Sequence, residues 1–171
     1  MALFRRDKEA ERDHRFQMRA KVLSIGDDFW IENEEGERAY KVNGKAMRIR
    51  NTFVLEDRDG NEVAKIQEKK LHVRGTMKVE RAGDTLATVH KALVGIRDRF
   101  DVEVEHGDDL KIRGNIVDHE YEIKRDGDVV ATISKKWFRV RDTYGIEIKR
   151  GEDEAMLLAL TVAVDDMSRP G

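Results

Sequence analysis

A phrase of eight residues that occurs four times is the feature that most constrains the fold of this chain. The copies begin at Ile49, Val73, Ile96 and Val140. Each copy has an arginine at its second position, fourteen residues after a glycine, and these glycines are Gly36, Gly60, Gly83 and Gly127. An internal repeat indicates that one supersecondary unit has been copied. Aspartate beside three of the glycines is typical of hairpin turns, so the copied unit is predicted to be made of β-strands.

A short strand is predicted after each glycine turn, and the repeated phrase continues as the next strand. The strands after the glycines cover residues 39–42, 63–66, 86–89 and 129–133. Further strands are predicted at 16–23, from 29 onward, near 110–112 and at 121–124. Short strands at regular spacing predict a sandwich or a barrel. Consecutive copies favour an antiparallel meander, and closing it into a barrel removes the exposed edges.

Residues 155–164 break this pattern, because they form a run that is apolar on every side of a helix. A helix of this length rises about 15 Å, half of a bilayer core of about 30 Å, so a membrane span is not expected. The acidic residues 152–154 before the run suit a helix N-terminus. We therefore predict a central helix over about residues 153–166. Enclosing it takes a barrel of more than about eight strands, since side chains alone fill a barrel of that size.

Composition excludes several classes of protein. The chain has 171 residues with 33 basic and 35 acidic side chains, which argues against a dedicated nucleic-acid binder. It has no cysteine, so disulfides and thiolate chemistry are excluded and a cytoplasmic location is expected. We predict a charged arm over residues 1–14 and a single barrel domain over residues 15–171. We expect a monomer with no cofactor and no metal.

Several motifs in order resemble one known family. They are residues 24–31, 41–46, 66–69, 114–123 and 134–145. Over roughly residues 15–167 the chain is similar to the LURP-one-related family, in its prokaryotic branch. The resemblance implies a tubby C-terminal-like fold, which is a closed antiparallel barrel of about twelve strands around a hydrophobic C-terminal helix. The same wider group contains phospholipid scramblases and the tubby domains, which bind phosphoinositide head groups at a basic patch. The resemblance offers no catalytic motif that could be assigned to residues of this chain.

Basic residues are the main candidates for a binding site. The candidates lie in or next to equivalent turns of the repeats, and they are Lys69, Lys70, Lys91, Lys135, Lys136 and Arg139. If these turns gather at one end of the barrel, they offer a surface to the phosphates of anionic lipids. The repeated arginines are expected on barrel strands, pointing outward. The alternative is a solvated face on which the cations pair with the equally abundant acids.

Other motifs are interpreted as structural. The pairs Phe29-Trp30 and Trp137-Phe138 lie in alternating strands, so one member of each is expected in the core. Residues 57–62 resemble a calcium loop, but the glycine is fourth and not sixth, which predicts a hairpin turn. Residues 118–120 lack a second histidine at helical spacing, so they do not match a zincin site. No catalytic motif is recognisable.

These patterns favour a non-enzymatic binding module, whose ligand is an anionic phospholipid head group or a protein partner at the membrane. Such a module would be cytoplasmic and peripheral to the membrane. One alternative is a soluble structural or protein-interaction barrel with no role in lipid binding. Another is an enzyme or small-ligand carrier that uses a cavity beside the central helix.

Overall fold

The repeated units form strands of a single sheet, and along these strands the side chains alternate between the inside and the outside of the sheet. The computed structural model describes residues 13–19, 28–44, 52–69, 75–92, 99–137 and 143–168. The strands in these ranges are β1 His14–Arg19, β2 Phe29–Asn33, β3 Arg38–Asn43, β4 Thr52–Asp57, β5 Glu62–Glu68, β6 Thr76–Arg81, β7 Asp84–Lys91, β8 Phe100–Val104, β9 Leu110–Asn115, β10 Glu120–Arg125, β11 Asp128–Ser134 and β12 Thr143–Ile148. They are followed by one helix, α3 Glu154–Met167.

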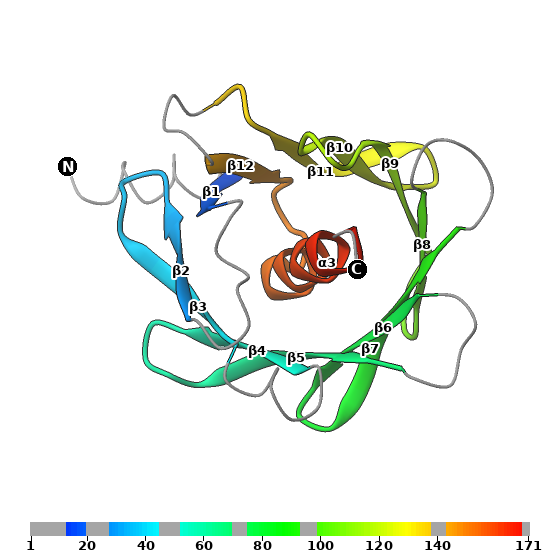
Figure 1. The fold of residues 1–171 in the computed structure, drawn as a ribbon, viewed down its shortest axis with the longest axis horizontal. Helices are drawn as coiled ribbons and strands as arrows, with labels where there is room; N and C mark the ends of the chain where they lie inside the picture. Colours follow the sequence, from blue (N-terminus) through cyan, green and yellow to red (C-terminus); the bar gives the residue numbers. More distant parts are fainter. Residues whose placement is uncertain are drawn as a thin grey trace.

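The twelve strands form a closed antiparallel barrel in which each strand pairs with its neighbours in sequence. β1 closes the barrel against β12, with His14 opposite Ile148 and Arg19 opposite Thr143. Viewed down the barrel, the strands encircle α3, which lies in the centre (Figure 1). The predicted fold class, a closed barrel of about twelve strands around a C-terminal helix, is confirmed.

The four glycines of the repeat lie in tight turns between strands. Gly36, Gly60, Gly83 and Gly127 have φ angles between 76° and 86°, which are left-handed values that glycine adopts without steric cost. These turns join β2 to β3, β4 to β5, β6 to β7 and β10 to β11. Each copy of the repeat therefore contributes one odd-numbered and one even-numbered strand, and it spans the barrel once in each direction.

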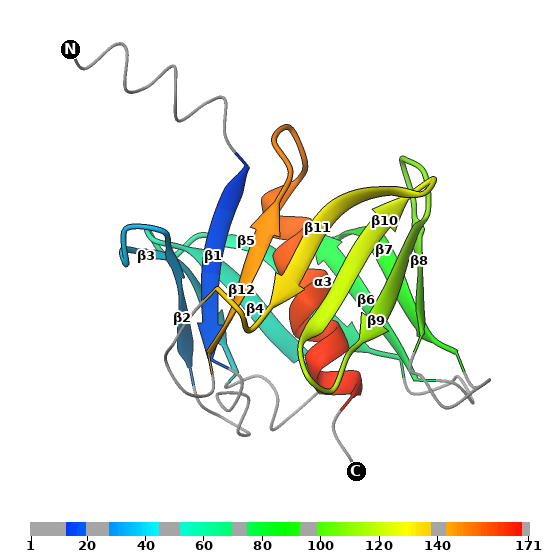
Figure 2. The same cartoon turned by 90° about the horizontal axis from the view of Figure 1, so that it is seen from above.

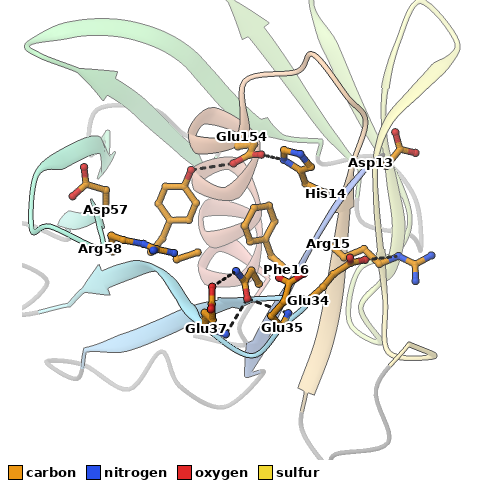
Figure 3. A pocket seen from close by; sticks show the side chains of 13 residues that line it. Asp13, His14, Arg15, Phe16, Glu34, Glu35, Glu37, Asp57, Arg58 and Glu154 are labelled. Atoms are coloured by element: carbon orange, nitrogen blue, oxygen red, sulfur yellow. Dashed lines mark hydrogen bonds and ion pairs between the residues drawn. The ribbon is translucent and has the colours of Figure 1, made fainter. Parts of the chain in front are cut away.

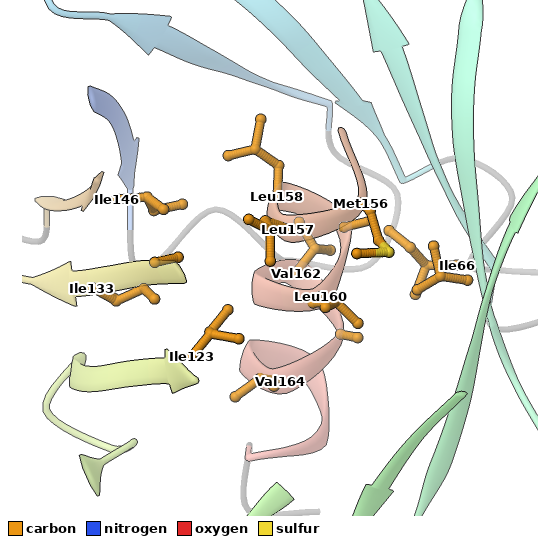
Figure 4. Packing of buried hydrophobic residues seen from close by; sticks show 14 of the residues in the cluster. Ile66, Ile123, Ile133, Ile146, Met156, Leu157, Leu158, Leu160, Val162 and Val164 are labelled. Carbon is orange, nitrogen blue, oxygen red and sulfur yellow. The ribbon is translucent and has the colours of Figure 1, made fainter. Parts of the chain in front are cut away.

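The inner face of the barrel and the whole central part of α3 form one apolar core. Residues 156–164 of the helix are all buried, and Leu157 to Leu160 have no exposed surface. In Figure 4, Met156 points toward Ile66 of β5, while Ile133 and Ile146 line the opposite side of the helix. A helix that is apolar all round is stable only inside such an enclosure.

Helix α3 begins and ends with polar caps. Asp153 is the N-cap, and its Oδ1 accepts the amide hydrogen of Met156 at 3.1 Å. At the other end, the hydroxyl of Ser168 donates to the carbonyl oxygen of Val164 at 2.6 Å. The helix lies one residue further along the chain than the predicted 153–166. Within the described ranges, no helix has the length and apolar character that crossing a bilayer requires.

Some expectations fall on residues that the structure does not describe. Residues 1–12, most of the predicted charged arm, lie outside the described ranges. The four repeated arginines also lie outside them, and these are Arg50, Arg74, Arg97 and Arg141. Their predicted outward direction stays a prediction.

Shortening a side chain of the central helix should cost much of the stability of the barrel. Leu160 is fully buried, so Leu160→Ala should lower the free energy of unfolding by about 2–5 kcal/mol through lost apolar contact and a residual cavity. Urea unfolding followed by circular dichroism measures this change. The matched control is Val117→Ala, because Val117 is 69% exposed and its replacement should change stability by less than about 0.5 kcal/mol. Equal, small effects of both replacements would contradict burial of α3.

Candidate functional site

The antiparallel order places the predicted lysine turns at one end of the barrel. β5, β7 and β11 are all odd-numbered strands, so they run in the same direction and finish at the same end. Lys69 follows β5, Lys91 is the last residue of β7, and Lys135 and Lys136 follow β11. α3 starts at the opposite end, after β12, and finishes among these strand ends (Figure 2). We call this the lysine end, and the end where α3 starts the acidic end.

The four lysines share one end of the barrel but form two separate groups on its rim. Neighbouring strands lie about 4.8 Å apart, so the two strand spacings from β5 to β7 separate Lys69 from Lys91 by roughly 10 Å along the wall. The four strand spacings from β7 to β11 separate Lys91 from Lys135 by roughly 19 Å. Lys70 and Arg139, the other two predicted residues, lie outside the described ranges.

The lysines also differ in what surrounds them. Lys91 donates from Nζ to the carbonyl oxygen of Met167 at 3.3 Å, at the negative end of the helix dipole. Lys135 and Lys136 are exposed, whereas Lys69 is half-buried. Glu120 Oε1 accepts the backbone N–H of Lys135 at 2.9 Å, and Ser134 Oγ accepts that of Lys136 at 3.1 Å. The backbone of this pair is therefore fixed while its side chains are left to solvent.

Three successive acidic residues hold the start of α3 to strands on different sides of the barrel. Arg81 of β6 makes two hydrogen bonds to Asp153, at 2.8 and 2.9 Å. Arg125 of β10 pairs in the same bidentate way with Glu152, at 2.8 and 3.0 Å. Bidentate pairs of this kind fix orientation as well as distance. The hydrogen bonds with these carboxylates raise the pKa of both arginines.

The third acidic residue, Glu154, lies in a cavity of about 700 Å³ at the acidic end. It accepts a hydrogen bond from the Tyr40 hydroxyl at 3.1 Å and pairs with His14 (Figure 3). Burial and the nearby Glu154 carboxylate raise the pKa of Tyr40. Asp57, which also lines the cavity, accepts the amide hydrogens of Asp59 and Asn61 at 2.9 Å. The carboxylates of Glu154 and Asp57 are thus engaged in holding the fold.

A second polar cluster holds the end of α3 at the lysine end. The hydroxyl of Tyr144 donates to Asp165, and His119 Nε2 lies 3.3 Å from the same carboxylate. The His119 ring stacks on Tyr144 with 4.3 Å between the ring centroids. The side chain of Asp165 is only 7% exposed, so these two partners replace water around a carboxylate next to the barrel core.

The pair Phe29-Trp30 lies in β2 and is placed as the alternation predicts, whereas Trp137 lies in the turn after β11, so the expected alternating strand is wrong for the second pair. Phe29 is 5% exposed and belongs to the core, whereas Trp30 lies outward under the guanidinium of Arg38, 4.8 Å from the ring centroid. Arg15 lies 5.2 Å from the ring centroid of Trp137 in the same way. Phe138 lies outside the described ranges. Both tryptophans thus pack against the guanidinium group of an arginine.

The predicted turn at residues 57–62 is a hairpin turn between β4 and β5. Its first residue, Asp57, accepts backbone N–H groups of the turn, above all that of Asn61, and these bonds lower the pKa of its carboxyl. In the part of the chain that the structure describes, no three histidine, aspartate or glutamate side chains are grouped to hold a metal ion.

Sequence reasoning did not find the polar clusters at the two ends of α3. The acidic residues before the apolar run gave a signal for a helix start, but not for the partners on β1, β3, β6 and β10. Arg81 and Asp153 are 72 residues apart, and His14 and Glu154 are 140 residues apart. Such pairs follow from the closed barrel and not from local spacing.

Comparisons with known proteins agree with this geometry. A family model of LURP-one-related proteins matches residues 14–165. A search of curated proteins finds no match. Among solved structures, an X-ray structure of an Arabidopsis thaliana protein superposes with a TM-score of 0.71, at 22% identity and over 93% of each chain. At this identity the likeness shows a shared fold.

The Asp153–Arg81 pair should stabilise the protein in a pH-dependent way. Desolvation opposes ionisation of Asp153, but Arg81 and the Met156 N–H outweigh it and hold the pKa below the usual 3.8. The Asp153 carboxylate therefore adds its full contribution to the free energy of unfolding above about pH 3.8, the pKa of the unfolded state. This contribution is lost as the pH falls through the lower pKa of the folded state. Asp153→Asn, which keeps a capping acceptor, should cost about 0.5–1 kcal/mol at pH 7, since both partners are over a third exposed.

Urea unfolding between pH 7 and pH 2.5 measures the difference in free energy of unfolding between the wild type and Asp153→Asn. This difference should shrink below about pH 3.8. The matched control repeats the replacement in an Arg81→Gln background, where most of the pH-dependent part should be absent. A difference that stays constant over the whole pH range would show that the ion pair does not stabilise the fold.

Proposed function

The chain belongs to the LURP-one-related family, and we propose that it is a binding module whose lysine end docks on anionic phospholipid head groups. One observation carries this proposal: the strand order puts the repeat turns that carry Lys69, Lys91 and Lys135-Lys136 at the same end of the barrel. Lysines near an anionic bilayer each contribute about 1 kcal/mol of attraction, so a few of them on one rim suffice for reversible binding.

The contrast between the two barrel ends supports an oriented interaction. At the acidic end, the described turns also expose Arg58 and Arg150, but exposed acids outnumber them, including Glu34, Glu35, Asp108, Asp109 and Asp126, so an anionic surface repels this end. At the lysine end, Lys135 and Lys136 are exposed on a fixed backbone. A molecule with this distribution of charge approaches an anionic surface with its lysine end first.

We further propose that the module acts by binding and not by catalysis, as a cytoplasmic monomer that is peripheral to the membrane. Two of the carboxylates that line the cavity at the acidic end, those of Glu154 and Asp57, are engaged in hydrogen bonds that hold the barrel. The cavity at the acidic end, with its volume of about 700 Å³, favours small-ligand carriage as a second candidate function. A protein partner at the membrane remains compatible with the same surface.

Vesicle flotation tests the lipid proposal. The protein should float with vesicles that contain phosphatidylserine but not with pure phosphatidylcholine, and moderate salt should weaken the binding. The double variant Lys135→Gln/Lys136→Gln should bind about thirtyfold more weakly, because two lysines are lost. The matched control Arg58→Gln/Arg150→Gln removes the same charge from exposed positions at the acidic end, and it should bind like the wild type.

Absence of salt-sensitive binding to any anionic vesicle would contradict the lipid proposal. Equal losses for the two double variants would contradict the assignment to the lysine end. A partner captured from cell extract without lipid would instead support the protein-interaction barrel.

A further inference from the structure

The turn between β9 and β10 presents an apolar side chain to solvent at the lysine end. Among the large hydrophobic residues that the structure describes, Val117 alone is exposed, at 69%. It lies in the turn of residues 116–119, which follows an odd-numbered strand and so belongs to the lysine end. In Figure 2 this turn lies beside the last turn of α3.

The turn is held in shape by its own hydrogen bonds. Asn115 Nδ2 donates to Asp118 Oδ2 at 2.7 Å, and the Asp118 amide donates back to Asn115 Oδ1 at 3.2 Å. The His119 amide donates to the carbonyl oxygen of Ile116 at 3.1 Å, and the side chain of Ile116 is buried. Val117 is therefore presented outward by a turn whose neighbouring residues are fixed.

Contacts below the turn fix it to the barrel. Gly114 has a φ angle of 137°, and a Cβ atom there would lie 2.6 Å from the carbonyl oxygen of Glu120, so glycine is needed for this close approach. On the other side of the turn, His119 stacks on Tyr144 and pairs with Asp165 of α3. The position of Val117 is thus set by β9, β12 and the end of the central helix.

The same turn is connected to the exposed lysine pair. Glu120 follows it directly, and the Glu120 carboxylate accepts the hydroxyl of Ser134 at 2.8 and 3.0 Å as well as the amide of Lys135. β10 and β11 are hydrogen-bonded neighbours. Val117 and the pair Lys135 and Lys136 are therefore held on adjacent connections of the same rim.

We propose that Val117 is the point at which the barrel inserts into the interfacial layer of an anionic bilayer, with Lys135 and Lys136 beside it at the phosphates. This inference rests on the proposed lipid-binding function and adds to it the element that enters the membrane. A single valine buries little apolar area, so electrostatic attraction has to supply the rest of the affinity, and binding stays reversible.

Because the chain has no cysteine, a label can be placed at a single position. Val117→Cys carrying the environment-sensitive dye NBD should show blue-shifted, stronger emission with vesicles of phosphatidylcholine and phosphatidylserine at 7:3, but not with pure phosphatidylcholine. Glu105→Cys, labelled in the same way on the exposed β8–β9 turn at the acidic end, should show no change. Flotation of the same samples reports binding independently of the dye.

Unlabelled variants provide a second measurement. Val117→Asn should weaken vesicle binding about three- to tenfold, and Val117→Phe should strengthen it, through the apolar area each offers to the interface. Flotation without a dye response at position 117, or unchanged affinity of both variants, would overturn insertion and leave the lysine end as a purely electrostatic surface. Failure to float with any anionic vesicle would instead overturn the proposed function and this inference together.

Discussion

Enclosure of α3 is the constraint on which the rest of the structure depends. The helix has no polar face, so the barrel has to surround it with apolar side chains along residues 156–164. Its charged side chains lie at its two ends, where Asp153 meets Arg81, Glu154 meets Tyr40 and His14, and Asp165 meets Tyr144 and His119. The inner wall of the barrel therefore packs on the apolar helix, and the charged clusters that hold the helix lie at the two ends of the barrel.

The repeat gives those two ends different chemical characters. Each copy contains two strands, so a turn of one kind always falls at one end and a turn of the other kind always falls at the opposite end. The glycine turns collect at the acidic end, and the lysine turns collect around the finish of α3. Copying a two-strand unit thus repeats a local difference between two turns around the whole barrel, so that its two ends differ in charge. A charged surface can distinguish the two ends.

The fold could be predicted because its determinants are local: hairpin glycines with Asp neighbours, alternating strands, and an apolar run that fits neither a surface helix nor a bilayer. The candidate site could be predicted only in part. Strand parity shows that Lys69, Lys91 and Lys135 share an end, but their separation of several strands depends on barrel geometry. The Arg81–Asp153 pair and the His119–Asp165 contact depend on strand register and on the depth of the helix, which no local pattern encodes. Val117 directly follows Ile116, another β-branched apolar residue, and only the structure distinguishes exposed Val117 from buried Ile116.

The orientation of the barrel on an anionic bilayer tests the central claim most directly. Nuclear magnetic resonance of the protein on phosphatidylserine nanodiscs that carry a spin-labelled head group reports which amides approach the membrane. The amide signals of His119 and Lys135, at the lysine end, should broaden, while those of Glu35 and Asp126 at the acidic end should stay sharp. Broadening at the acidic end, or equal broadening at both ends, would contradict a barrel whose polarity directs it to the membrane.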